Sequence, residues 1–529
     1  MDYVRCNRLA VAASLHRFIE QQVLADTSLV PELFWERCEA LVHELAPQVR
    51  DLLMERERLQ QALAHWHQAH TAAPAAGSAW REHLQHIGYL QPVPAPFRAT
   101  TANVDMEISD QCGPCLHVPG TPLKPLLEAA NARWGSLYQA LYDSDVIAMA
   151  PGCEHDAGRN PQRAANVVVH ARELLDAVVP LAIGSHVDAR HYRISNGQLI
   201  VTQANGEQTG LRHRSHYLGF QGDPRQPTAI LLKHHGLHLQ ICIAAQSRAG
   251  VCDVAGISDV LLEAAVSVII DTGTTLDRIT LFQHWLGLMQ GTLAGLAADH
   301  RYQAAAGGEL RLPGRALSML RVNGLHRYCP AMLDAHGQAI PALLLDTLLG
   351  SLIALHDRQR RGNARSGSVY LLVPHLQGPQ EAVFVDRLFE RLEALLDLPA
   401  CTLKAGLIDQ HWRTTLNLQA CVQALATRIA WLGTDLSPCD ASVDTDHRAC
   451  VETVQHHNRL VGLACGLSGR AQWFSTEPVS SPAAATLQAL HYHHIDYLQR
   501  QRNLQQQDPA QQCAALREQL LDMAQAHSG

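Results

Sequence analysis

Apolar side chains recur every three or four positions over much of the N-terminal part of the chain. In the stretch PELFWERCEALVHEL these positions are Phe34, Cys38, Leu41, Val42 and Leu45. The stretch VRDLLMERERLQQALAHWH repeats the pattern, and charged residues fill its other face. Because residues three and four apart share one face of a helix, the spacing predicts amphipathic helices over residues 1–70. The segment TAAPAAGS at 71–78 predicts a linker or a long turn.

Beyond about residue 100 the pattern changes, and short apolar runs alternate with helical stretches. LHLQICIA at 237–244 alternates strictly and predicts a half-buried strand. The segment 260–273 predicts a helix that runs into a strand. Further strands are predicted at 315–324, 368–379, 402–409 and 431–436. The alternation predicts parallel strands covered by helices. Polar residues at the strand ends, such as Asp271, Arg321 and Asp409, are typical of the C-terminal rim of a (β/α)8 barrel.

Composition limits the partners and the location that we expect. The chain has 529 residues, 47% of them hydrophobic and 17% charged, with a formal net charge of −8. These values are typical of a globular protein and favour neither nucleic acid nor a membrane as a partner. No apolar run approaches the roughly 20 residues of a membrane-spanning helix. The 14 cysteines form no dense framework, which favours reduced thiols and a cytoplasmic location.

Cysteine and histidine groupings offer candidate chemistry. Cys112 and Cys115 have the spacing of a thioredoxin-type redox pair. They precede LHVP, the predicted first barrel strand, and would lie towards the N-terminal face, away from the rim where barrel enzymes act. We therefore favour two packed thiols over a redox or metal role. The 31 histidines include HYHH (491–494) and KHHGLH (233–238). Composition explains these clusters more simply than metal binding, which needs a convergence that a sequence does not display.

Seven longer segments point to one family. They are NARWGSLYQALYDSD (131–145), LLEAAVSVIID (261–271), WLGLMQGTL (285–293), ARSGSVYLL (364–372), HLQGPQEAVF (375–384), LKAGLIDQHWRTTLNLQAC (403–421) and SSPAAATLQALHYH (480–493). Taken in this order, they resemble the malate synthases of the G isoform along nearly the whole chain. The resemblance implies an α/β fold built on a TIM (β/α)8 barrel. It also implies an N-terminal helical clasp, an inserted α/β domain and a reduced C-terminal helical segment.

The resemblance gives expected domain boundaries. The helical clasp is expected at 1–88, and the barrel at 89–134, 251–282 and 314–460. The inserted α/β domain is expected at 135–250 and 283–313. The remnant of the C-terminal helical region would occupy 461–529, where a Gln-rich stretch leads into the amphipathic pattern ALREQLLDMAQ.

The family reaction implies a set of requirements at the barrel rim. Acetyl-CoA condenses with metal-bound glyoxylate, and hydrolysis of the thioester then yields malate. An arginine stabilises negative charge, carboxylates hold Mg²⁺, a carboxylate base removes a proton, and a pocket holds CoA. Arg321 in MLRVNG falls on the family's catalytic arginine, with Asp271 and Asp409 as further candidates for binding substrate. The alternative for Arg321 is a structural pair with a carboxylate of the rim.

Other family positions have changed. The acidic positions at the family's metal site fall on Gln410, Pro438 and Gly273. A neutral amide lacks the charge that lets a protein oxygen compete with water for Mg²⁺, so we expect the family's Mg²⁺ to be absent. The family's base lies far beyond the ALHYH motif, whereas this chain ends 36 residues after His493. Lys124 and Pro125 replace an arginine and a tyrosine at the CoA site, which leaves the adenine without an aromatic partner there.

Three functions remain open. The first is a repurposed enzyme that has lost the malate condensation and acts on a small carboxylate or 2-oxo acid at the barrel mouth. The second is a non-catalytic binding or scaffold protein that works with a partner protein. The third is an active malate synthase whose metal ligands come from elsewhere. A replacement site for a transition metal is a further hypothesis, with candidate ligands His411, Asp435, Cys439 and Asp440.

Overall fold

A parallel sheet forms the centre of the molecule. The computed structural model of the chain describes residues 2–70, 77–111, 113–154, 160–273, 277–434, 445–467, 479–494, 503–504, 506 and 508–528. The six-stranded sheet has the order β20-β19-β18-β15-β12-β3. Its strands are β3 (Cys115–Pro119), β12 (Ser267–Asp271), β15 (Leu317–Arg321), β18 (Val369–Val373), β19 (Leu403–Asp409) and β20 (Ile429–Thr434). All five pairings are parallel, and Val479 adds a parallel bridge to Leu116 beyond β3.

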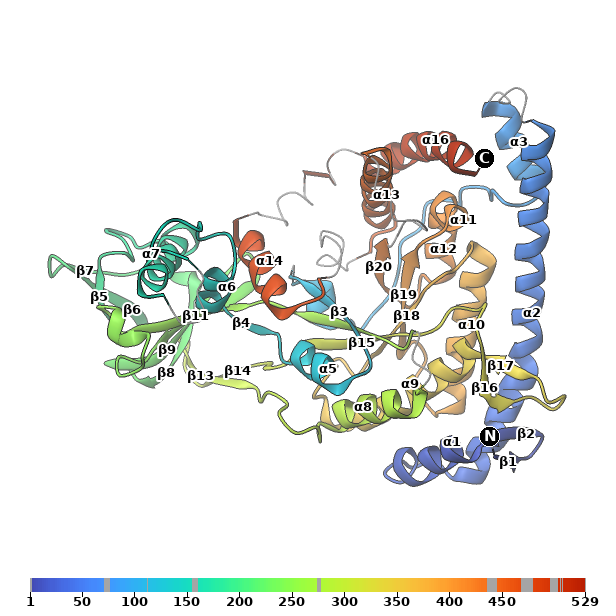
Figure 1. Cartoon of the computed structure of the whole chain (residues 1–529), viewed down its shortest axis with the longest axis horizontal. Coiled ribbons are helices and arrows are strands. Elements are labelled where there is room, and N and C mark those ends of the chain that lie inside the picture. Colours follow the sequence, from blue (N-terminus) through green and yellow to red (C-terminus); the bar gives the residue numbers. More distant parts are fainter. Residues whose placement is uncertain are drawn as a thin grey trace.

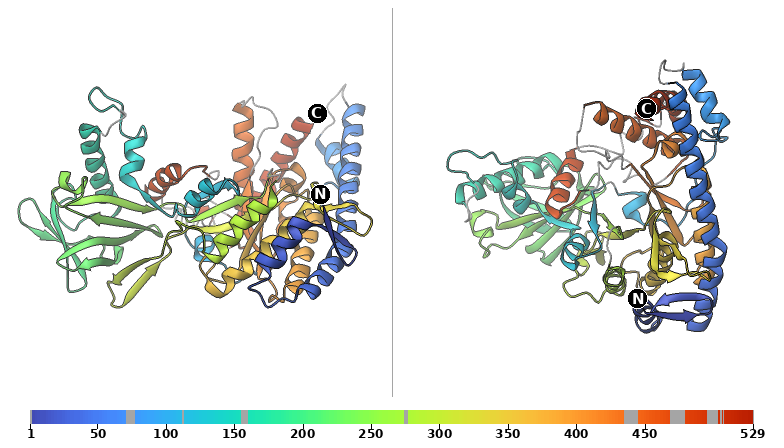
Figure 2. Two further views of the ribbon diagram at one scale, coloured as in Figure 1. Left: turned by 60° about the horizontal axis from the view of Figure 1, so that its bottom comes forward. Right: turned by 45° about the vertical axis from the view of Figure 1, so that its right-hand side comes forward.

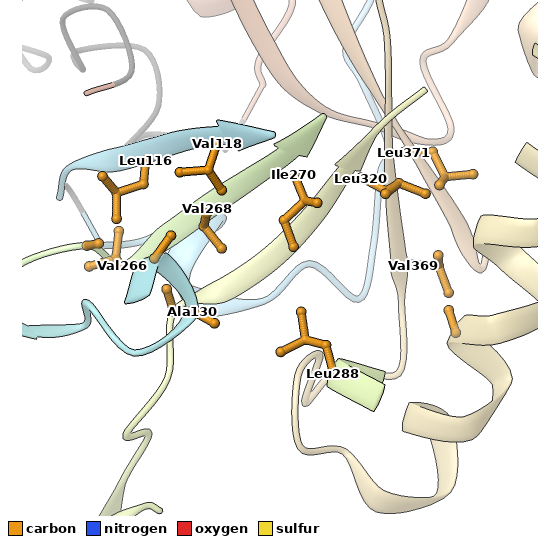
Figure 3. Close-up of a cluster of buried hydrophobic side chains, with 14 of the residues drawn as sticks. Leu116, Val118, Ala130, Val266, Val268, Ile270, Leu288, Leu320, Val369 and Leu371 are labelled. Carbon is orange, nitrogen blue, oxygen red and sulfur yellow. The ribbon is translucent and has the colours of Figure 1, made fainter. Parts of the chain in front are cut away.

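The strands form where apolar residues run almost without interruption, as expected for strands buried on both faces. Leu116, Val268, Ile270, Leu320 and Leu371 come from four neighbouring strands and pack into one core (Figure 3). The sheet curls, and helices cover its outer side (Figure 1). They are α5 (Leu123–Ala130), α8 (Arg278–Gln290), α9 (Ala342–Arg360), α10 (Pro379–Leu395), α11 (Trp412–Leu416) and α12 (Leu418–Ala424). The predicted α/β architecture with a curled parallel sheet is confirmed.

A second, antiparallel sheet forms the core of the inserted part. Its order is β14-β13-β8-β9-β10-β11-β4. The strands are β4 (Trp134–Ser136), β8 (Tyr217–Asp223), β9 (Gln226–His234), β10 (Leu237–Ile243), β11 (Ile257–Glu263), β13 (His300–Ala304) and β14 (Glu309–Leu312). Helices α6 (Leu137–Asp143) and α7 (Pro161–Val178) and a small sheet of β5 (Ala189–Ser195), β6 (Gln198–Gln203) and β7 (Gln208–Thr209) complete it. Strand β10 matches the position of the strand predicted at 237–244, but its first five residues are all buried, so the half-buried pattern was wrong.

The segment 260–273 differs from its prediction. It holds the end of strand β11 and the whole of β12, and no helix. A continuous apolar run does not separate a helix from two buried strands by periodicity alone, which explains the error. Strand β11 also hydrogen-bonds into the antiparallel sheet, although it lies in the segment 251–282 expected in the barrel. The barrel strand itself starts at Ser267.

The N-terminal part combines a long helix with a small sheet. Helix α2 (Pro31–Ala69) has 39 residues, includes Pro47 and runs along the barrel, at the opposite end of the molecule from the inserted sheet (Figures 1 and 2). Helix α3 (Gly77–His86) follows. The all-helical prediction for residues 1–70 is wrong at its start. Strands β1 (Tyr3–Cys6) and β2 (Leu9–Ala12) pair with β16 (Tyr328–Leu333) and β17 (Ala339–Pro341) before helix α1 (Ala13–Phe18) begins.

Three helices make up the described C-terminal part: α13 (Thr445–Ala464), α14 (Pro482–His494) and α16 (Pro509–Ser528). The amphipathic pattern ALREQLLDMAQ lies within α16. Its residues Leu520 and Leu521 pack with Val454 of α13 and with Trp80 and Leu84 of α3, so the two ends of the chain share a small core. Among the described residues, no helix is both long and apolar enough to span a bilayer.

Candidate functional site

An arginine and an aspartate meet at the C-terminal ends of adjacent strands. Arg321 is the last residue of β15 and Asp271 the last of β12, and the two face each other in the parallel register. Arg321 Nη1 donates to Asp271 Oδ2 over 2.5 Å. Strand register alone therefore brings together two of the residues singled out from the sequence. The rim carboxylate anticipated as a structural partner for Arg321 is Asp271.

Asp271 is held as a carboxylate by a set of donors. Besides Arg321, His117 Nε2 of β3 lies 3.2 Å from Oδ2, and the backbone N–H of Gly273 donates to Oδ1 over 2.7 Å. Burial opposes ionisation, but the hydrogen bond from His117 and the charge of Arg321 outweigh it and hold the pKa of Asp271 below its usual value. At neutral pH this corner of the rim is an ion pair.

A cavity of about 390 Å³ opens beside this pair. Its wall includes Arg321, Arg327, Asp271, His117 and His375. Two guanidinium groups thus face the cavity against one carboxylate among its described lining residues. The surplus of positive charge and the fork of N–H donors on arginine suit a small anion such as a carboxylate.

Asp409, the third candidate for binding substrate, has a different environment. It ends β19 and is fully buried. Its oxygens accept hydrogen bonds from Thr415 Oγ1 at 2.9 Å and from Asn458 Nδ2 at 3.0 Å. Burial raises the pKa of Asp409 to about 7, because these neutral donors offset only part of the loss of hydration. Asp409 does not line the cavity beside Arg321. The structure groups it with helices α11 and α13 instead.

Gln410 has a local role in the rim. Its Oε1 accepts the backbone N–H of His375 at 2.9 Å. His375 has a φ of 59°, a left-handed conformation that costs free energy in a residue with a side chain, so this hydrogen bond helps to hold the turn after β18. At the other acidic family position, a Cβ added to Gly273 would lie 3.0 Å from Asp271 Oδ1. A second carboxylate there would crowd the ion pair.

Two histidines at the rim, His326 and His375, were missed in the sequence, and the structure places them beside the candidate His411. His326, His375 and His411 follow three successive strands of the sheet, β15, β18 and β19. The rings of His326 and His375 are 5.2 Å apart, and those of His375 and His411 are 5.7 Å apart. Burial, followed by the charge of Arg56 and the neighbouring His326, lowers the pKa of His411 to about 4. Their positions shortly after strand ends were the available signal.

Arg56 of helix α2 closes this side of the rim. It makes two hydrogen bonds to the carboxylate of Glu381 in α10, at 2.5 and 2.7 Å, and one to the carbonyl of His375 at 2.7 Å. Glu381 is almost completely buried and also accepts the backbone N–H of Gln377. Because the partner lies 325 residues away in the sequence, spacing along the chain gave no sign of the pair.

The described rim does not fit the family's Mg²⁺. The oxygens of Asp271 are engaged by Arg321, His117 and Gly273, and the amide oxygen of Gln410 is engaged by His375. Mg²⁺ is usually held by one or two free carboxylates, with water and substrate oxygens completing its shell. Over the residues that the structure describes, no three His, Cys, Asp or Glu side chains converge as a metal site. Pro438 and the replacement candidates Asp435, Cys439 and Asp440 lie outside the described residues, so only His411 of that set is placed.

Two remaining groups of candidates lie away from the cavity. The Lys124 side chain is 85% exposed on α5 and lies 3.9 Å from Glu128, and Pro125 follows it in the same helix. Cys115 is buried at the start of β3, and burial raises the pKa of its thiol to about 12, which suits a packed, unreactive thiol. Cys112 lies outside the described residues.

Together, the curled parallel sheet, the inserted antiparallel sheet and the arginine at the rim define a TIM-barrel protein with an elaborated barrel. The TIM-barrel domain model of malate synthase matches residues 317–437. The N-terminal domain model of malate synthase matches 14–75, and the α/β insertion domain model of malate synthase G matches 159–234.

Curated relatives agree with these matches. Malate synthase G of Halalkalibacterium halodurans is 36% identical over 94% of this chain and 77% of its own length. The proteins of the same name from Corynebacterium efficiens and Corynebacterium glutamicum are each 33% identical over 95% of this chain, and over 75% and 76% of their own lengths. The chain belongs to the malate synthase G family.

Proposed function

We propose that the barrel mouth binds a small carboxylate or 2-oxo acid through Arg321, and that the chain no longer carries out the condensation that forms malate. The proposal rests on one observation: two parts of the rim differ in the charge of their side chains. One half holds the Arg321–Asp271 ion pair beside a cavity. The other half holds Gln410, a histidine with a pKa of about 4 and an aspartate with a pKa of about 7. The first half favours an anion, and the second disfavours a divalent cation.

Arg321 is suited to bind such an anion. Its side chain is 14% exposed, so part of the guanidinium reaches the cavity while Asp271 fixes its position. Arg327 adds a second positive charge to the wall. A carboxylate in the cavity would be met by donors already in place, which limits the entropy lost on binding. A 2-oxo acid offers both a carboxylate and an oxo group to these donors.

A second candidate is an active malate synthase, favoured by the relatives named malate synthase G. Fold and ancestry do not fix activity, since function depends on the residues of the site. The neutral Gln410 and the engaged Asp271 oppose this candidate because they leave Mg²⁺ without the charged oxygens that it prefers. The two candidates differ in a single measurable reaction.

Thermal-shift titration with glyoxylate and pyruvate tests anion binding. We expect stabilisation of the wild type by at least one of the two acids, and loss of that response in Arg321→Ala. Arg321→Lys keeps a positive charge without the fork of donors, and should keep a weaker response. Arg321→Lys also provides the test of anion binding if Arg321→Ala does not fold. A response that is unchanged in both variants, or absent from the wild type for both acids, would contradict the proposal.

The release of CoA thiol from acetyl-CoA in the presence of glyoxylate and Mg²⁺ tests the condensation. We expect no release above the background without enzyme. Release that depends on both substrates and on Arg321 would instead establish the second candidate. The scaffold alternative remains if no acid binds and no thiol is released.

A further inference from the structure

A second, larger cavity lies at the opposite end of the barrel. Its volume is about 980 Å³. Its lining includes Arg315, which comes just before β15, and residues 360–362, 365 and 366, which come just before β18. These positions belong to the N-terminal face of the parallel sheet, whereas Arg321 and Asp271 lie at the C-terminal face. The cavity is therefore separate from the site at the mouth.

Arginines dominate the wall of this cavity. Six arginines line it against three carboxylates among its described lining residues. Arg133 is neutralised by Glu107 and Glu263, at 2.6 and 2.7 Å. Asp105 is engaged by Ser366 and Tyr370. The remaining five arginines of the lining are Arg311, Arg315, Arg360, Arg361 and Arg365. The lining offers them one carboxylate, Asp299, which pairs with Arg311 and Arg365, and Asp357 behind the wall adds a negative charge near Arg315.

Arg315 and Arg360 have no ion-pair partner within the part of the chain that the structure describes. Arg315 is half-buried, and its Nη2 donates to the carbonyl of Gly362 at 3.0 Å. A Cβ on Gly362 would lie 2.9 Å from this nitrogen, so the glycine permits the close approach. Burial lowers the pKa of Arg315; the charges of Asp357 and Asp299 oppose this shift, and the charges of Arg360 and Arg365 add to it. The guanidinium groups are thus close enough to repel one another.

Two buried structural arginines elsewhere in this chain have carboxylate partners, although a third, Arg163, donates its side-chain hydrogen bonds to backbone carbonyls alone among the described residues. Arg172 is buried with two hydrogen bonds to Asp253, and Arg428 is buried with Asp386 and Glu393. In both cases carboxylates offset the charge. Repulsion among the arginines of the cavity costs free energy, and a bound anion would remove that cost. The contrast indicates a site for a ligand with several negative charges.

The other wall of the cavity is apolar. It includes Val104, Met106, Leu296, Leu312 and Pro313. Met106 is 57% exposed and leaves apolar surface open on this wall. A wall of arginines facing an apolar wall matches a molecule with phosphates at one end and a flat, largely apolar group at the other. The cavity volume is at the upper end of the range of about 300–1,000 Å³ found for small-molecule sites.

We propose that this arginine-lined cavity at the N-terminal face of the barrel binds a nucleoside polyphosphate, with the phosphates on Arg315, Arg360 and Arg365 and the base against Leu312 and Pro313. The ligand would act as an effector or a stabilising ligand. The cavity lies at the face away from the mouth, and the proposal does not depend on which reaction, if any, occurs there.

Calorimetric titration of the full chain with ATP, inorganic triphosphate and adenosine tests the proposal. We expect ATP to bind more tightly than triphosphate, and adenosine to bind at least tenfold more weakly than ATP. Arg360→Ala removes an exposed side chain without an ion pair, so it should preserve the fold and weaken ATP binding at least fivefold. Arg358→Ala is the matched control, because it removes an arginine from the same last turn of α9 that does not line the cavity. We expect less than a twofold change in that variant.

Two further outcomes decide the location and the class of ligand. Arg321→Lys, at the mouth, should leave ATP binding unchanged, and a loss there equal to that of Arg360→Ala would overturn the assignment to the N-terminal face. Equal affinities for triphosphate and ATP would overturn the role of the apolar wall. Absence of ATP binding to the wild type, or equal effects of Arg358→Ala and Arg360→Ala, would overturn the proposal as a whole.

Discussion

Strands in both halves of the barrel rim end in an aspartate, but the two aspartates differ in their ionisation. Strand β12 ends in Asp271 and strand β19 in Asp409. Asp271 faces Arg321 and His117, and its pKa is held below the usual value although burial opposes this. Asp409 meets neutral donors, which are the side chains of Thr415 and Asn458 and the backbone of His411, and burial raises its pKa to about 7. At pH 7 the same residue is thus an ion pair at the ends of β12 and β15, the charged half of the rim, and about half protonated at the end of β19, the neutral half.

This difference shows that a carboxylate at a strand end does not define a site by itself. Its partners, supplied by other strands and helices, decide whether it carries charge. In the charged half, the partners come from adjacent strands and leave Arg321 beside a cavity. In the neutral half, burial lowers the pKa of His411, and Arg56 of helix α2, which pairs with Glu381, lowers it further. A divalent cation would therefore find its negative ligands in only one half of the described rim.

Removing Arg56 should disturb the neutral half most strongly. In Arg56→Ala, the carboxylate of Glu381, whose side chain is 1% exposed, loses its guanidinium partner. We expect a loss of about 3 kcal/mol in the free energy of unfolding, because an uncompensated buried charge remains. The pKa of His411 should also rise above 4, since the nearby positive charge has gone. Urea unfolding measures the first effect, and NMR titration of the histidine ring measures the second.

Arg58→Ala is the control on the same helix. Arg58 pairs with Glu55, and its side chain is 52% exposed, so we expect a loss of less than about 1 kcal/mol. Equal losses in the two variants would show that Arg56 acts only as a surface residue. A shift of the His411 pKa in Arg58→Ala but not in Arg56→Ala would contradict the electrostatic account of the neutral half.

The charged half was largely predictable from the sequence, and the neutral half was not. Apolar runs ending in Asp271 and Arg321 predicted two parallel strands, and a parallel register then places their last residues side by side. Asp409 was found by the same pattern, but its burial depends on Asn458, which belongs to a helix 49 residues further on. Arg56 reaches its partner across more than half of the chain. Contacts of this kind leave no local periodicity.

Prediction of the fold from the sequence was also limited where structure depends on distant partners or on fully apolar runs. Strands with alternating or apolar runs were located well, as β10, β15 and β19 demonstrate. The helix predicted at the start of 260–273 is instead part of β11, because a fully apolar run fits either structure. Strands β1 and β2 are four residues each and pair with β16 and β17 from the middle of the chain. Such short strands are stabilised by their partners and carry little signal of their own.

The stability of the two halves should respond to pH in opposite directions. The pKa of Asp409 is raised from 3.8 to about 7 on folding, so its contribution is fully present below about pH 4 and is lost as the pH rises through 7. Asp409→Asn removes this titration, and the amide can still bond with Thr415 and Asn458. We expect the wild type to lose roughly 2 kcal/mol of stability relative to this variant between pH 5 and pH 8.

Asp271→Asn is the matched comparison in the charged half. The pKa of Asp271 is lowered on folding, so its contribution is present at neutral pH and is lost as the pH falls. The difference between wild type and Asp271→Asn should therefore shrink on acidification, whereas Asp409→Asn should become more stable than the wild type by a margin that grows on alkalisation. Chemical unfolding at a series of pH values measures both. Parallel curves for the wild type and Asp409→Asn would show that this carboxyl titrates normally.

The smallest effect on stability is expected for Gln410→Glu, which returns a carboxylate to the neutral half. A glutamate oxygen can still accept the N–H of His375, so we expect a change of less than about 1 kcal/mol without metal. The variant is informative when Mg²⁺ is added. A ligand that binds only the folded state raises its stability, and the new charge supplies an oxygen ligand of the kind that Mg²⁺ prefers. We expect millimolar MgCl₂ to raise the melting temperature of Gln410→Glu above that in NaCl of equal ionic strength, and to leave the wild type unchanged. If the wild type responds to Mg²⁺ as strongly as the variant, the amide half already binds the ion, and the division of the rim into charged and neutral halves does not govern metal binding.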